Sequence, residues 1–135
     1  MRVHPLDYYS KCDWNAIREE ADRHETPFLV VNLNVVARQY AELMHQFPFA
    51  KVYYAVKANP GIPVLELLRD LGSNFDIASV YELDRVLSLG VEPSRLSYGN
   101  TIKKARDIRY FYKKGVRLFA SDSEADIRQL AQEAP

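Results

Sequence analysis

One lysine stands where an amine could act as a nucleophile. Residues 52–56 are apolar on both faces, as in a strand that is covered on both sides, and Lys57 follows directly. Burying an ammonium there without a partner would be costly and would favour the neutral amine, which can condense with an aldehyde. The alternative, that Lys57 turns outward into solvent, stays open on position alone.

Polar residues also follow the other apolar runs. Asp76 ends a second run, where its carboxylate could pair with a cationic imine or a substrate ammonium, although a structural role is the alternative. Glu82 has capping-box spacing to Ser79, so we assign it to a helix start. Asn100 and Asp122 follow the third and fourth runs and are expected to cap helices.

Other kinds of site are not indicated. His4, His24 and His45 are scattered, without the paired spacing of metal ligands, so no metal is expected. The phosphate-binding and nucleophile motifs GxGxxG, GxxxxGK[ST] and GxSxG are absent from the sequence. A basic run near the C-terminus comprises Lys103, Lys104, Arg106, Arg109, Lys113, Lys114 and Arg117. Its interleaved aromatic residues lie partly on a helical apolar stripe, which favours a solvated outer face over a nucleic-acid site.

The elements that would position these residues alternate. Apolar runs at 51–56, 74–78, 95–98 and 116–120 predict strands whose starts lie about 21 to 23 residues apart. Amphipathic stretches after them predict helices with these apolar faces: Val64, Leu65, Leu68 and Leu71; Leu83, Val86 and Leu87; Ile102, Ala105, Ile108 and Tyr112; Ile127, Leu130, Ala131 and Ala134. Gly72, Gly90 and Gly115 are expected to end the first three helices. Repeated strand–helix units predict a parallel α/β sheet, either a barrel or a doubly wound sheet.

The N-terminal part differs from this pattern. Helices are expected over about 13–24 and 36–47, with a short strand at 28–31 between them. Lys plus Arg and Asp plus Glu both number 18, so no overall charge attracts nucleic acid or a membrane surface. The longest apolar runs fall far short of the roughly 18 residues of a membrane span, and Cys12 is the single cysteine. A soluble, cytoplasmic protein is expected.

The segment YAVKAN at 54–59 resembles pyridoxal-phosphate-dependent decarboxylases with an alanine-racemase-like barrel, known as fold type III. Further matches are FDIAS at 75–79, Glu82, YGN at 98–100, KK at 103–104 and DSE at 122–124. As a set they are most similar to ornithine decarboxylases and their lysine- and arginine-handling relatives. Residues 1–33 then form a lead-in segment, and residues 34–135 the front half of a (β/α)₈ TIM-type barrel with about four βα units.

The resemblance implies the roles of individual residues. Lys57 would form the internal Schiff base with pyridoxal 5′-phosphate, Ala55 would line the cofactor, and Asp76 would be a polar neighbour of the imine. The substrate would be a basic amino acid, with ornithine giving putrescine for polyamine biosynthesis, and the full-length enzyme would be a homodimer. The remaining cofactor residues of the family come later in the chain than Pro135.

A complete barrel takes about 250 residues, so the chain is expected to be an N-terminal fragment, inactive by itself. Its unpaired strand edges would favour self-association. Two alternatives stay open: a non-catalytic homologue or carrier that binds pyridoxal phosphate or a partner, and a relative of diaminopimelate decarboxylases or alanine racemases.

Overall fold

The computed structural model describes residues 4–135, which divide into two compact units, 4–32 and 33–135. In the first unit a 3₁₀ turn, Pro5–Asp7, precedes helix α1, Lys11–Arg23. Ser10 caps α1 by accepting a hydrogen bond from the Asp13 N–H. Within the described residues, no helix is both long enough and apolar enough to cross a membrane.

The strand expected at 28–31 is wrong. These residues are assigned to neither strand nor helix, and Leu29 is 82% exposed. Apolar, β-branched residues favour an extended backbone, but a strand also requires main-chain hydrogen bonds to a neighbouring strand. The segment therefore belongs to no sheet among the described residues.

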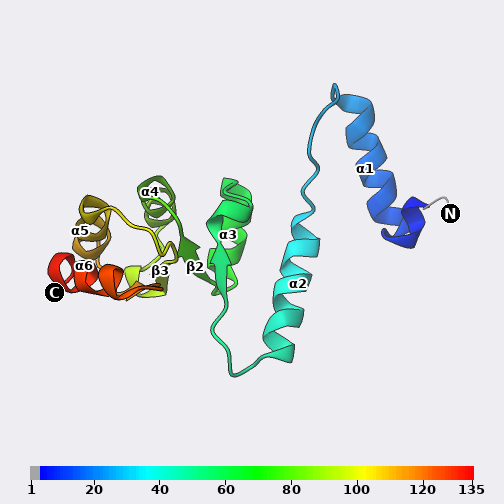
Figure 1. Ribbon diagram of the computed structural model, residues 1–135. Helices are drawn as coiled ribbons and strands as arrows, with labels where there is room; N and C mark the ends of the chain where they lie inside the picture. The colour runs from blue at the N-terminus through cyan, green and yellow to red at the C-terminus, as the bar shows by residue number, and fades with distance from the viewer. Residues whose placement is uncertain (1–3) are drawn as a thin grey trace. The chain divides into compact units, whose positions relative to one another are not determined.

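The second unit contains the alternating elements (Figure 1). They are α2 Leu33–Gln46, β1 Tyr53–Ala55, η2 Val56–Ala58, α3 Ile62–Asp70, β2 Asn74–Ile77, α4 Val80–Ser88, η3 Pro93–Arg95, β3 Leu96–Tyr98, α5 Ala105–Lys113, β4 Leu118–Phe119 and α6 Glu124–Glu133. The strands form one parallel sheet in the order β1-β2-β3-β4. This confirms the prediction of consecutive βα units, each strand being joined to the next through a helix.

The two faces of the sheet differ in chemistry. Phe75, Ile77, Leu96 and Tyr98 are buried and belong to the core formed with the helices. The Tyr98 ring stacks on Phe111 of α5, with ring centroids 3.8 Å apart. Because side chains alternate along a strand, the residues between these core positions point to the opposite face. That face carries the polar residues of β2 and β3.

The predicted helix ends are confirmed. Gly72, Gly90 and Gly115 follow α3, α4 and α5 with φ of 86°, 79° and 95°, a left-handed conformation that glycine adopts without a steric cost. Four predicted apolar positions are wrong, because Leu71, Ile102, Ile127 and Ala131 are exposed. Ile102 lies before α5 and is 91% exposed, because the loop turns the adjacent residue inward instead. Ile127 on α6 is 58% exposed, since α6 packs along one side, against α5.

Two arginines join the elements at the edge where the strands begin. Arg95 donates from its guanidinium to the main-chain carbonyls of Ser73 and Arg69, the latter at 3.0 Å. Arg69 in turn donates to the Leu89 carbonyl at the end of α4, at 2.8 Å. These bonds satisfy carbonyls at two helix ends, so this edge of the sheet has a structural role.

Candidate active site

The candidate site lies at the opposite edge, where the strands end. Ala55 of β1 is in register with Asp76 of β2, and Asp76 is in register with Ser97 of β3. Residues in register on parallel strands point to the same face, so these three side chains form one row across the face that carries the polar residues of β2 and β3. Lys57 comes two residues after Ala55, in the 3₁₀ turn η2, and is exposed. The Lys57 amine is therefore exposed at the end of β1 and is not buried.

Asp76 is held in place by its neighbours. The Ser97 hydroxyl donates to Asp76 Oδ1 at 2.6 Å. A Cβ placed on Gly99 would lie 2.2 Å and 2.3 Å from the two carboxylate oxygens of Asp76. The carboxylate thus occupies the space above the Gly99 backbone, and only glycine leaves that space open. Neither Ser97 nor Gly99 was predicted as a site residue, although the two strands are spaced so that Ser97, 21 residues after Asp76, lies beside it.

The end of β2 is fixed by three further bonds. The Ala78 N–H donates to Glu82 Oε2 at 2.6 Å, and the Glu82 N–H donates to the Ser79 hydroxyl at 3.3 Å, which confirms that Ser79 caps α4. The Asn100 amide donates to the Ala78 carbonyl at 2.5 Å. The prediction that Asn100 caps a helix is therefore wrong, because the N-cap position of α5 is Lys104 and the Asn100 amide bonds across to β2 instead.

Lys103 was predicted to lie on a solvated face, and this is wrong: its side chain is fully buried. Its Nζ lies 2.6 Å from Asp126 Oδ2 and 2.8 Å from the Ala120 carbonyl oxygen. The charged carboxylate and carbonyl oxygens replace water around the ammonium, which is the condition for burying it. The other six members of the basic run are exposed.

Asp126 belongs to the first turn of α6. Burial disfavours its charged form, but hydrogen bonds from Lys103 and Ser121, together with the positive charge of Lys103, hold the pKa of Asp126 below its usual range. The predicted helix cap at Asp122 is wrong by one residue. Ser123 is the N-cap and accepts a hydrogen bond from the Asp126 N–H at 3.2 Å.

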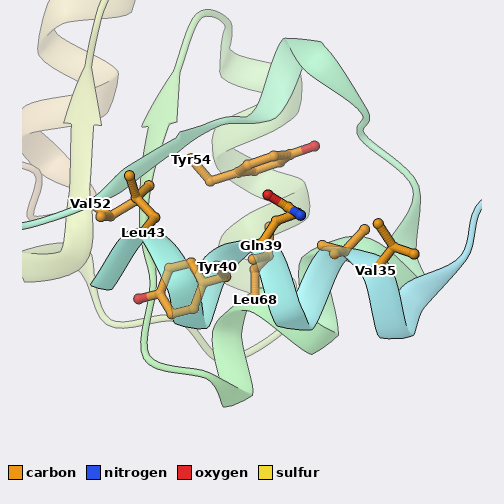
Figure 2. A pocket seen from close by; sticks show the side chains of 8 residues that line it. Val35, Gln39, Tyr40, Leu43, Val52, Tyr54 and Leu68 are labelled. Carbon is orange, nitrogen blue, oxygen red and sulfur yellow. The ribbon is translucent and has the colours of Figure 1, made fainter. Parts of the chain in front are cut away.

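A cavity of about 340 Å³ lies elsewhere in this unit, between α2, α3 and the start of β1 (Figure 2). It is lined by Val35, Val36, Gln39, Tyr40, Leu43, Val52, Tyr54 and Leu68. Neither Lys57 nor Asp76 lines it. Because the cavity is predominantly apolar and lacks a charged or nucleophilic side chain, we assign the candidate site to the sheet face.

Comparison with known proteins identifies the family. Residues 33–135 match the model of the pyridoxal-dependent decarboxylases, pyridoxal binding domain. The chain belongs to this family. It is 39% identical to the lysine/ornithine decarboxylase of Selenomonas ruminantium over 119 residues, which cover 88% of the chain and 30% of that protein. It is also 39% identical over 111 residues to the ornithine decarboxylase of Saccharomyces cerevisiae, covering 82% of the chain and 24% of that protein.

Solved structures of the family have the same fold. The crystal structure of the Selenomonas ruminantium lysine decarboxylase superposes with a TM-score of 0.83 at 35% identity, covering all of this chain and 34% of that one. A structure of this enzyme with pyridoxal phosphate and cadaverine gives a TM-score of 0.82. The chain thus spans about a third of the length of these structures. Its fold is that of the N-terminal part of a TIM-barrel decarboxylase, and the doubly wound alternative is excluded.

The residues at the sheet edge fit pyridoxal phosphate. An amine, which the cofactor aldehyde requires, is exposed at Lys57, and Ala55 carries only a methyl group. The Asp76 carboxylate is already oriented by Ser97 on the same face. Residues 4–135 contain no cluster of three or more His, Cys, Asp or Glu side chains that could hold a metal ion.

Proposed function

We propose that this chain supplies the cofactor-attachment lysine and part of the sheet face of a pyridoxal-phosphate-dependent decarboxylase of basic amino acids. Residues 34–135 then form the front half of its barrel, and the residues before them a lead-in segment. The observation that carries the proposal is the position of Lys57, which follows β1 two residues after Ala55, the strand residue in register with Asp76, in a pyridoxal-binding domain.

When bound, pyridoxal phosphate supplies an aldehyde for an amine and a ring that accepts the electron pair released as carbon dioxide leaves. The Lys57 amine would hold the cofactor at the sheet edge through that aldehyde. Asp76 places a negative charge on the same face, which favours a protonated nitrogen there. Ser97 fixes the carboxylate by donating to Oδ1. Ala55 carries only a methyl group and so allows a ring close to the strand.

Ornithine is the proposed substrate, decarboxylated to putrescine and carbon dioxide in polyamine biosynthesis. Support comes from relatives named ornithine decarboxylases in Saccharomyces cerevisiae and Schizosaccharomyces pombe, each 39% identical over the matched region. A lysine/ornithine decarboxylase of Vibrio vulnificus complexed with putrescine superposes with a TM-score of 0.83 at 26% identity. Lysine and arginine are the competing substrates. The full-length enzyme is proposed to be a cytoplasmic homodimer, which the family resemblance supports.

Reductive trapping tests the attachment site. The chain is incubated with pyridoxal phosphate, reduced with borohydride and digested, and the labelled peptide is mapped by mass spectrometry. We expect the adduct mainly on Lys57, and Lys57→Arg should abolish this adduct. Lys51→Arg, which removes an exposed lysine just before β1, is the matched control and should leave it intact. Labelling spread evenly over many surface lysines would contradict the proposal.

A second candidate function is binding to a regulatory protein without catalysis. It is favoured by one relative, antizyme inhibitor 2 of Xenopus laevis, which is 33% identical over 121 residues. The presence of Lys57 argues against it, because a protein that only binds a partner needs no cofactor lysine. Pull-down with a full-length decarboxylase distinguishes the two, since only the binding function predicts capture together with an absence of specific labelling at Lys57.

A further inference from the structure

Lys103 joins the ends of two strands to the start of a helix. Besides Asp126 and the Ala120 carbonyl, its Nζ lies 3.0 Å from the Asn100 carbonyl oxygen and 3.3 Å from that of Thr101. Asn100 and Thr101 follow β3, Ala120 follows β4, and Asp126 is in α6. A lysine ammonium has three protons, so it satisfies these acceptors by sharing. One side chain therefore holds the loop after β3 against both the next strand and the next helix.

This loop in turn contacts the candidate site at two points. The Asn100 side chain donates to the carbonyl of Ala78, two residues after Asp76. Gly99, the neighbour of Asn100 in the chain, has its backbone directly against the Asp76 carboxylate. Any displacement of residues 99–100 must therefore move the end of β2 or the carboxylate itself.

The energetics indicate that the buried ion pair has a role other than adding stability. Removing two charges from water costs several kcal/mol per ion in general, and well-packed apolar residues often stabilise a protein as well or better. What the pair provides is a fixed geometry, because an ammonium surrounded by oxygens from three loop residues, Asn100, Thr101 and Ala120, has few alternative positions.

We propose that Lys103 is a positioning residue of the active site. By holding the loop after β3, it fixes the Asp76 carboxylate at the C-terminal end of β2. This rests on the proposed function, in which Asp76 belongs to that site. Lys103 itself does not touch the reacting atoms in this arrangement. It acts through Gly99 and Asn100.

The direct test is the carboxyl ¹³C resonance of Asp76, measured by NMR on the chain without cofactor. We expect this resonance to shift in Lys103→Met and to stay unchanged in Lys104→Met, which removes the same charge from the exposed neighbouring residue. Asn100→Ala leaves the ion pair in place and removes only the bond to Ala78, and we expect it also to shift the resonance. An unchanged Asp76 resonance in Asn100→Ala would overturn the proposal.

A variant without an unpaired buried charge separates positioning from folding. Lys103→Met combined with Asp126→Leu removes both partners, so that no lone charge remains in the interior. We expect this double variant to fold while the Asp76 resonance still shifts, and reductive labelling of Lys57 to slow by about tenfold or more. A normal Asp76 resonance in the folded double variant would show that Lys103 only stabilises the fold.

The two readouts keep the proposals distinct. If labelling is not specific for Lys57 in the unmodified chain, the proposed function fails whatever the NMR result. If labelling is specific but the variants leave Asp76 unchanged, only the positioning role fails.

Discussion

The carboxylate of Asp76 occupies the space that a side chain at Gly99 would fill. The ideal Cβ position at Gly99 is 2.2 Å from Asp76 Oδ1, far inside van der Waals contact. The same oxygen accepts a hydrogen bond from Ser97 at 2.6 Å. Ser97 in β3 and Gly99 just after it thus determine where the Asp76 carboxylate of β2 lies. This relationship can be tested without any cofactor.

Gly99→Ala should displace the Asp76 carboxylate and break its bond to Ser97. We expect the free energy of unfolding to fall by about 1–3 kcal/mol, the usual cost of overpacking a filled site. Urea titration followed by circular dichroism measures this. Adding Asp76→Ala removes the atoms that clash, so the double variant should lose less than the sum of the single variants. Strict additivity would show that the two positions do not interact.

The chain should become less stable in acid, because protonation of Asp126 removes its ion pair with Lys103. The folded-state pKa of Asp126 is lowered, so its stabilising contribution is fully present above the unfolded value, about 4, and is lost as the pH falls through the folded pKa. Unfolding free energies between pH 6 and about pH 2 measure the loss.

The matched control for the acid effect is Asp122→Asn, at an exposed position four residues before Asp126. It should leave the pH dependence almost unchanged, whereas the double variant Lys103→Met with Asp126→Leu should flatten it. Equal slopes in all three proteins would mean that other carboxyl groups dominate the acid response.

Arg95 should matter for stability but not for the candidate site. Arg95→Ala leaves the Ser73 and Arg69 carbonyls without their charged donor, and we expect a loss of about 2 kcal/mol in unfolding free energy. The Asp76 carboxyl resonance should not move, because Arg95 lies at the edge where the strands begin. A shift of that resonance would mean that the two edges are coupled.

The stacked pair of Tyr98 and Phe111 should dominate the packing between β3 and α5. Phe111 is fully buried, so Phe111→Ala should cost about 3–5 kcal/mol in a chemical denaturation experiment. Tyr81→Ala provides the comparison on a neighbouring helix: its side chain is 83% exposed, and truncation should change stability by less than about 0.5 kcal/mol. Similar losses for both variants would be inconsistent with this core.

The sequence was sufficient to predict the alternating elements and the strand ends at which Lys57 and Asp76 lie. Periodic apolar residues and the glycine helix ends depend on local conformation, so residues 33–135 were predicted with the right element types and order. The placement of Lys57 and Asp76 at strand exits followed from the same reasoning. Their proposed chemistry came from the family resemblance, because position alone did not separate a functional lysine from a surface one.

The predictions that were wrong depended on partners distant in sequence. A strand at 28–31 requires a neighbour for its main-chain groups, which composition does not reveal. Lys103 looked like one more member of a basic helix, yet its carboxylate partner lies 23 residues later in the chain. Asn100 likewise bonds 22 residues back, to Ala78. Such contacts depend on the register between strands. The pattern of residues within a single strand or helix does not predict that register.

Most of the oxygens around Lys103 come from the main chain. Asn100, Thr101 and Ala120 each contribute a carbonyl group, and only Asp126 contributes a side chain. Since every amino acid supplies a carbonyl, Thr101 and Ala120 can be exchanged during evolution without removing a ligand of the ammonium. Lys103 and Asp126 can change only together. Among related chains we therefore expect amino-acid differences at Thr101 and Ala120, which contribute only main-chain carbonyls, more often than at Lys103 and Asp126.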